Sequence, residues 1–500
     1  MRLSLGRVTR GALWLSIGVV LSNFFGFIYW VLISKIVSVE IIGKAATIIG
    51  LNMLTISLLN LGIPTGAQRF MGFSYGRNDH AKLSEYFYTN MLFMFATSLL
   101  TGLFFILLGI ASISILSLDS LSLIFLGILT IFGMGGGWST VGQSFCKTVV
   151  KTEYVALSQL SSSLLRLVVS LALVFAGYEF VGVMVGYVVA SLVFSILQLL
   201  LPVRMLRSLG SGFSTSLSSL IDCVKAGVVS WLPNILSLFG QWLGVLGVYA
   251  FVGLAETGLF FIALTVTSIV VSFSQSILTL SFPMISGMVD GRKRMMSRVV
   301  RFSASVMMPI TFFLIAYPHV IPMLLGGQYI ASSELVRILS IGYILSPIIL
   351  GYVYYVYAVD RYRDVLTVGL AGTIPRLILY PLMINWYGEV GAAIAFSTAS
   401  PIQLLAVLVN ASKINYKLHL RDHLKIIALP SVVSTLLVLL NVSWPIGFVT
   451  ILLTSYILYA RLGMITRDDL REVGEAVLSR KVLEKIYPHI RELLSLIYGA

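Results

Sequence analysis

The stretch 154–182, YVALSQLSSSLLRLVVSLALVFAGYEFVG, holds an apolar run long enough to cross a membrane, with Arg166 near its centre. A second stretch, 365–391, VLTVGLAGTIPRLILYPLMINWYGEVG, has the same form around Arg376. A charged side chain at the bilayer centre costs about 2.5–3.5 kcal/mol on insertion scales. Neither apolar run contains a carboxylate, so each cation lacks an acidic neighbour in its own segment. An anionic substrate is the simplest partner, and this pattern favours transport.

A structural interpretation of the two arginines stays open. An arginine in a membrane helix can bond to backbone carbonyls at a kink or extend toward an interface. Pro375 makes a kink plausible at Arg376, because proline frees a carbonyl one turn back. No proline precedes Arg166 in its run, and both arginines lie far from the ends of their runs. If the arginines face a cavity, phosphate suits them, because a guanidinium binds its oxygens in pairs.

The composition is that of an all-α, multi-span membrane protein. Of 500 residues, 58% are hydrophobic and 11% are charged, whereas soluble domains carry about 25% charged residues. A helix needs roughly 20 mostly apolar residues to span the hydrocarbon layer. About fourteen such runs occur, at 12–34, 42–63, 88–110, 120–145, 155–177, 180–203, 228–252, 257–285, 302–325, 336–359, 365–386, 389–410, 424–441 and 445–461.

The basic residues predict the orientation of these spans. With the N-terminus inside, 29 of the 34 Lys and Arg residues fall at the inner side, as expected when positive loops stay in the cytoplasm. We therefore expect a plasma or inner membrane protein with both termini cytoplasmic. The net charge of +14 follows from this sorting, and it also suits anionic membrane lipids. Nucleic-acid binding is not expected, because the basic residues are dispersed over many short loops.

The sequence predicts two repeated lobes. Aligning Arg166 with Arg376 pairs Lys151 with Arg361 and Glu179 with Glu389, and one gap then pairs Gly182 with Gly391. Equivalent spans six helices apart run in the same direction, which predicts a parallel repeat with a pseudo-twofold axis along the membrane normal. The expected division is a six-helix lobe at 1–203, an amphipathic inner linker at 204–227, a second six-helix lobe at 228–410, two further helices at 411–461 and a cytoplasmic amphipathic tail at 462–500.

The sequence also predicts where the helix of the C-terminal tail begins. Thr466 and Asp469 stand three residues apart and predict a capping box at the start of the tail helix. We expect that helix to lie on the inner membrane surface or to pack against inner loops.

Polar residues within the spans are further candidates for substrate contact. Asn23 lies in the first span, and Asn234 and Gln241 lie in the seventh, six helices further on. Such amides could bond sugar hydroxyls, although most intramembrane amides join helices. The two cysteines and five histidines lack metal-ligand spacing, so neither a metal nor a disulfide is expected. No cofactor is expected either. An enzyme is disfavoured, because no loop carries the acidic pair that a lipid-linked transferase would use.

Three stretches resemble the polysaccharide (O-antigen-type) flippases of the multidrug/oligosaccharidyl-lipid/polysaccharide exporter superfamily. MRLSLGRVTRGALWLSIGVVLSNFFGFIYWVLISKIVSVEIIG (1–43) is similar to their opening helix, with its basic start and G-x-x-W. LNLGIPTGAQRF (59–70) is similar to the exit of their second helix. YPHVIPMLLGGQYIASSELVRILSIGY (317–343) is similar to the segment that leads into their tenth helix. The resemblance covers roughly 1–410.

This resemblance implies a V-shaped pair of six-helix lobes that moves a polyprenyl-diphosphate-linked oligosaccharide from the inner to the outer leaflet by alternating access. It implies that Arg166, Arg376 and, at the inner mouth, Arg69 meet the diphosphate-sugar, and that glycan-assembly enzymes are potential partners. The chain departs from the family pattern at Gln241–Trp242, where relatives often carry charged residues. The alternatives are a multidrug or organic-cation antiporter of the same superfamily and a non-transporting subunit of a glycan-assembly complex.

Overall fold

The computed structural model describes residues 5–113, 117–134, 137–288 and 290–469, and the side chains of parts of 5–20 and 280–287 lie outside this description. Within these residues the chain is helical and contains no strand. The elements are α1 (Leu5–Ser34), α2 (Val39–Asn60), α3 (Ile63–Gly76), α4 (His80–Ile110), α5 (Ser120–Ile131), α6 (Ser139–Thr148), α7 (Thr152–Phe175), α8 (Glu179–Ser208), α9 (Leu217–Phe251), α10 (Leu254–Gly287), α11 (Arg292–Ala316), α12 (Val320–Leu325), η1 (Gly327–Ser332), α13 (Ser333–Tyr343), α14 (Ser346–Ala358), α15 (Tyr362–Lys413), α16 (Leu420–Leu439) and α17 (Trp444–Arg461). The predicted all-α membrane fold is therefore confirmed.

Every predicted span corresponds to a helix, to part of one, or to two consecutive helices. Among the described residues, nine helices are long and apolar enough to cross a membrane, or ten if one bent pair counts as a single span. This number is below fourteen partly because α15 covers two predicted spans. Its backbone leaves helical geometry at Gly388, where φ is 57° and only glycine is comfortable.

Three predicted spans are broken in the structure. The run 302–325 is one of them, because α11 ends at Ala316 and α12 begins at Val320. The run 120–145 divides into α5 and α6, and the break holds the glycine-rich segment with Gly133 at a φ of 69°. The run 336–359 divides into α13 and α14, which with η1 form a pair bent by 44°. Pro347 stands in the first turn of α14, where its missing N–H costs no helical hydrogen bond. Apolar composition alone does not reveal such breaks.

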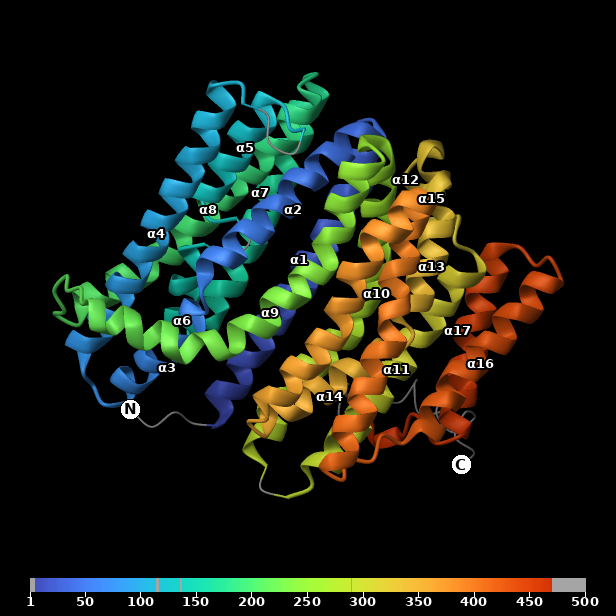
Figure 1. Cartoon of the computed structure of the whole chain (residues 1–500). Helices are drawn as coiled ribbons and strands as arrows, with labels where there is room; N and C mark the ends of the chain where they lie inside the picture. The colour runs from blue at the N-terminus through green and yellow to red at the C-terminus, as the bar shows by residue number, and fades with distance from the viewer. Residues whose placement is uncertain (1–4, 114–116, 135–136, 289, 470–500) are drawn as a thin grey trace, which may run out of the picture.

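The helices form two groups with α9 and α10 between them (Figure 1). Helices α4 to α8 gather on one side, α11 to α15 gather on the other, and α16 and α17 lie at the outer edge of the second group. The first group ends with α8 at Ser208, and α9 begins at Leu217. The exact lobe boundaries and the repeat axis stay predictions.

Helix α9 packs near α3 in its first half and against α15 in its second half. Near its start, the backbone of Gly227 packs against that of Gly62, so closely that a Cβ on Gly62 would lie 2.3 Å from the Gly227 carbonyl carbon. Further along, the Thr373 hydroxyl on α15 donates to the Leu236 carbonyl at 3.0 Å. The Tyr380 hydroxyl donates to the Gly240 carbonyl at 2.8 Å. The first part of α9 therefore belongs to the packing of α3, and the rest to that of α15.

The two halves of the chain are joined at the end predicted to face outward. The Gln328 amide in η1 donates to the carbonyls of Ser34 and Val37, each at 3.2 Å. The Ser34 hydroxyl donates to the Leu325 carbonyl at 3.2 Å. Helices α2 and α10 touch through glycine, because a Cβ on Gly43 would lie 1.9 Å from the Leu254 carbonyl oxygen. This end of the bundle is closed by direct contact.

The capping box predicted after the last span is confirmed. The Thr466 backbone N–H donates to the Asp469 carboxylate at 2.8 Å, and the Asp469 N–H donates to the Thr466 hydroxyl at 3.2 Å. Asp469 also pairs with Arg298 of α11 at 2.5 Å, which ties the start of the tail to the bundle. The rest of the predicted tail helix, from 470 onward, lies outside the described residues.

Candidate functional site: two adjoining polar cavities

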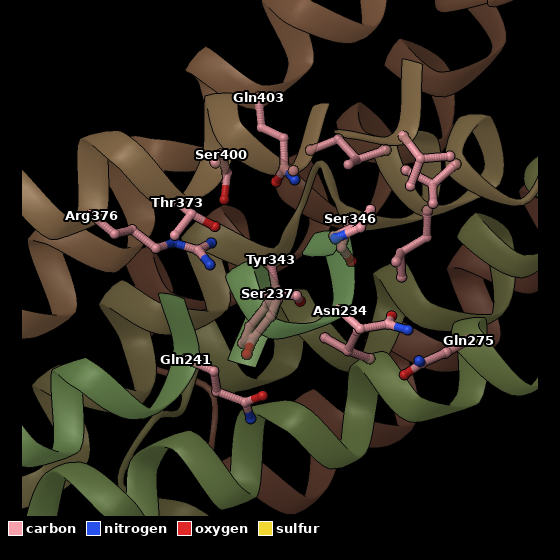
Figure 2. A pocket seen from close by; sticks show the side chains of 18 of the residues that line it. Asn234, Ser237, Gln241, Gln275, Tyr343, Ser346, Thr373, Arg376, Ser400 and Gln403 are labelled. Atoms are coloured by element: carbon pink, nitrogen blue, oxygen red, sulfur yellow. The ribbon is translucent and has the colours of Figure 1, made fainter. Parts of the chain in front are cut away.

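A polar cavity of about 580 Å³ lies among α9, α10, α13, α14 and α15. More than half of its lining residues carry a hydroxyl, amide or guanidinium group, and several of these groups converge on the centre (Figure 2). The polar lining residues are Ser230, Asn234, Ser237, Gln241, Ser268, Gln275, Tyr343, Ser346, Tyr354, Tyr357, Thr373, Arg376, Ser400 and Gln403. Polar groups that converge in one concave pocket are typical of a binding site.

The sequence builds this cavity with polar residues at helical spacing. On α9, Ser230, Asn234, Ser237 and Gln241 recur at intervals of three or four residues, which places them on one helix face. Gly369 and Gly372 on α15 also line the cavity and leave room because they lack side chains. The spacing of these residues therefore gives a polar gap between α9 and α15.

Arg376 contributes the cation of this cavity. Its Nε donates to the Phe396 carbonyl at 3.4 Å, and its guanidinium carbon lies 4.0 Å from the centre of the Phe396 ring. The residue is only partly buried, and Figure 2 shows the guanidinium pointing into the cavity. The structural interpretation has support at this position, because Arg376 has a carbonyl partner. The substrate-binding interpretation has support too, because the guanidinium faces open space.

A second cavity, of about 250 Å³, adjoins the first and contains Arg166. Its lining comes from α2, α7 and α8 of the first group, from Met134, and from α9 and α10. Gln241 and Ser268 line both cavities. The structure therefore brings Arg166, Arg376 and Gln241 to one central region between the two groups of helices.

Arg166 is held by aromatic rings. Its guanidinium carbon lies 4.8 Å from the centre of the Tyr29 ring and 4.9 Å from that of Tyr187, distances at which a cation is attracted to a ring face. Its Nε is buried and has no hydrogen-bond partner. The buried Ser22 hydroxyl and the Gln159 carbonyl oxygen also lack partners. A buried donor without a partner is costly, which is consistent with a ligand or water at this position.

The other predicted site residues occupy different places. Asn234 and Gln241 line the larger cavity. Asn23 is exposed on α1 and lines neither cavity, and it stands one turn from Gly26, which faces Arg166 Nη2. Arg69 is exposed on α3, away from both cavities. Burial is the main cause of the raised pKa of Tyr362, and the charge of Arg69 acts in the opposite direction by lowering that pKa.

Several lining residues were not assigned from the sequence. They include Ser230, Ser237, Gln275, Thr373, Ser400 and Gln403. The signal that could have found them is their spacing on α9, α10 and α15. By contrast, the intramembrane Asn52 joins helices, because its amide donates to the Met134 carbonyl at 2.9 Å and accepts from Thr130 at 3.0 Å.

Among the described residues that line the two cavities, there is no Asp or Glu. The same part of the chain holds no group of three His, Cys, Asp or Glu residues that could bind a metal ion. The electrostatic character of the central region is therefore set by two cations among neutral amides and hydroxyls. Such an arrangement can bind an anion that carries many hydroxyl groups.

The sequence matches the family described as "Polysaccharide biosynthesis protein" over residues 8–289, which is more than half of the chain. The chain belongs to this family. The match confirms the resemblance found in its opening helices. No curated protein sequence matches this chain.

Solved structures resemble this chain in fold. The lipid II flippase MurJ in an inward closed conformation has a TM-score of 0.64 at 15% identity, covering 90% of this chain and 99% of its own. An inward-facing multidrug resistance MATE family transporter of the MOP superfamily has a TM-score of 0.59 at 13% identity, covering 83% and 96%. The eukaryotic MATE transporter AtDTX14 has a TM-score of 0.56 at 14% identity, covering 85% and 97%. The fold is therefore that of the MurJ and MATE transporters.

Proposed function

We propose that this protein is a membrane transporter that moves a polyprenyl-diphosphate-linked oligosaccharide from the inner to the outer leaflet. The observation that carries the proposal is the pair of adjoining cavities, each with one arginine and neither with a carboxylate among its described lining residues. The family match and the flippase-like fold support it.

In this proposal the arginines bind the diphosphate and the amides bind the sugar. Diphosphate needs cationic donors, and guanidinium groups supply paired N–H bonds to phosphate oxygens. Asn234, Gln241 and Gln403 offer both donors and acceptors to sugar hydroxyls. The larger cavity, around Arg376, therefore receives the glycan, and Arg166 completes the charge of the diphosphate site.

The closed outer end fits one state of an alternating-access cycle. The bonds from Gln328 to Ser34 and Val37 hold the two halves together at that end. Opening outward requires these bonds and the α2–α10 glycine contact to separate. Arg69, at the opposite end, would meet the anionic headgroup first as it enters from the cytoplasmic leaflet.

The chemistry of the cavities disfavours the main alternative, a cation-exporting antiporter. Exchange of a proton or sodium ion against a cationic drug uses an intramembrane carboxylate. The described lining residues of both cavities supply arginines instead, and these repel cations.

The test is transport by the purified protein in proteoliposomes. A fluorescent polyprenyl-diphosphate oligosaccharide is placed in one leaflet, and its appearance in the other is measured with a membrane-impermeant quencher. Wild-type protein should accelerate exchange over protein-free vesicles, and Arg166→Ala with Arg376→Ala should abolish that acceleration. Exchange at the protein-free rate with wild-type protein would overturn the proposal.

A further inference from the structure

A third cavity, of about 340 Å³, is almost entirely apolar and lies beside the Arg376 cavity. It is formed by the second half of α9, by α15 and by Leu51 of α2. Its lining residues are Leu51, Leu243, Leu246, Gly247, Tyr249, Ala250, Phe251, Leu377, Tyr380, Pro381 and Ile384. We call it the α9–α15 groove.

The groove presents no free polar side-chain group to an occupant. Its two hydroxyl groups are both engaged elsewhere, since Tyr380 donates to the Gly240 carbonyl at 2.8 Å and Tyr249 donates to the Ser117 carbonyl at 2.9 Å. Phe251 and Leu377 at its border are 61% and 40% exposed. The groove is thus open at the surface of the bundle and suits a hydrocarbon chain.

The groove follows the arginine site along α15, since Arg376 lines the larger cavity and Leu377 lines the groove. Gly240 connects them, because its carbonyl accepts from Tyr380 and a Cβ at Gly240 would lie 3.3 Å from Arg376 Nη1. Tyr380 follows Arg376 by four residues, about 6 Å along the helix. From Arg376 the groove extends toward the ends of α9 and α10 that are predicted to face outward. A diphosphate on Arg376 would therefore place its attached lipid chain at the entrance of the groove.

We infer that the α9–α15 groove binds the polyprenyl chain of the substrate, holding the isoprene units next to the diphosphate while the headgroup occupies the Arg376 cavity. This inference rests on the proposed function. It assigns recognition of the lipid carrier to a wall of the second group of helices. The chain then points toward the outer leaflet while the headgroup is still at mid-membrane, which orders the substrate for release on that side.

Photo-crosslinking tests the inference. The full-length protein in nanodiscs is incubated with a polyprenyl diphosphate that carries a diazirine on the isoprene unit next to the diphosphate, and the labelled peptides are identified by mass spectrometry. Labels should fall on 243–251 and 377–384, and an unlabelled polyprenyl-diphosphate oligosaccharide should compete for them. Competed labels confined to other helices would overturn the inference. A phospholipid diazirine that labels the groove equally and competes equally would overturn it too, by showing a general lipid site.

A pair of variants sharpens the result. Ala250→Phe fills the groove, whereas Ala172→Phe places the same side chain on an exposed face of α7 outside it. The Kd of the polyprenyl diphosphate should rise about tenfold in Ala250→Phe, equal to about 1.4 kcal/mol, and stay unchanged in Ala172→Phe. The affinity for inorganic diphosphate should be the same in both. Wild-type affinity for the long-chain ligand in a folded Ala250→Phe protein would refute the groove. Absence of any competed label in the wild-type protein would instead refute the proposed function.

Discussion

Replacement of Arg376 is the most direct test of the proposed anion site, because the structure shows which of the arginine's N–H donors is already bonded. One edge of the guanidinium is used, with Nε donating to the Phe396 carbonyl at 3.4 Å and the ring of Phe396 below it at 4.0 Å. Arginine has five N–H donors, so four remain on the terminal nitrogens. These donors can form the paired bonds that a phosphate group accepts.

The expected loss of affinity follows from the free energy of such a hydrogen bond. A hydrogen bond to a charged group contributes about 1.5–3 kcal/mol, which corresponds to roughly 10–150-fold in affinity. Arg376→Ala should therefore weaken binding of a polyprenyl diphosphate by at least about tenfold. Arg376→Lys keeps the charge and loses the paired geometry, so its loss should be smaller. Phe396→Leu removes only the ring contact, worth about 0.5–1 kcal/mol, and should cost about 2–5-fold.

The assay is equilibrium binding to purified protein in nanodiscs, read beside thermal stability and the amount of protein in the membrane. Arg207→Ala, which removes an exposed cation at the end of α8, controls for loss of general positive charge. Arg376→Ala should still insert, because it removes a costly intramembrane charge. A well-folded Arg376→Ala protein with wild-type affinity would refute the anion site. Disappearance of Arg376→Ala and Arg376→Lys from the membrane would show that the contacts with Phe396 are structural.

Four further predictions address other parts of the molecule. Arg166→Ala should reduce glycan transport in proteoliposomes about as strongly as Arg376→Ala, with Arg166→Lys between it and wild type; wild-type transport by folded Arg166→Ala would remove this residue from the site. Gly258→Ala should separate α10 from α2, because its Cβ would lie 2.2 Å from the Val39 carbonyl oxygen, and should therefore increase labelling of a cysteine at position 241 by an outside reagent. Gly72→Ala is the control, because its Cβ would meet open space and should leave the labelling unchanged. Cysteines placed within 288–301 should react only from the cytoplasmic side and those within 253–257 only from outside, and the reverse pattern would invert the topology. Hydrogen bonds from Lys82 and, second, from Ser219 lower the Glu85 pKa. The stability that Glu85 supplies is therefore present at neutral pH and lost as the pH falls through that lowered pKa. Melting temperatures of wild type and Glu85→Gln should differ at pH 7 and converge in acid.

The sequence predicts the membrane fold well because one physical requirement dominates it. Each span must be apolar over a length set by the bilayer, and every backbone group in it must be bonded within the helix. That requirement is local, so runs such as 88–110 and 155–177 correspond directly to α4 and α7. Breaks within a run depend on single residues. Gly133 and Gly388 take positive φ values that an apolar count does not register.

The site was harder to predict because it depends on which helices face one another. Arg166 and Arg376 are visible from sequence, since a charge in an apolar run is costly wherever the run packs. Thr373 and Gln403 carry no such signal, because isolated polar residues in membrane helices usually join helices. Asn52 and Asn234 are alike in the sequence, yet Asn52 bonds to Met134 and Thr130 while Asn234 lines the cavity.

The apolar groove was the least predictable feature, because its residues differ in no way from lipid-facing ones. Leu377 and Ala250 are ordinary membrane side chains, and only the packing of α9 against α15 makes a cavity between them. Its placement matters for function, since a lipid-linked substrate has two chemically opposed ends joined at the diphosphate. Arg376 stands where those two environments meet, with neutral amides on one side and hydrocarbon on the other. Binding at that boundary would select for the linkage itself, so a carrier of this design could accept different glycans while still requiring the lipid diphosphate.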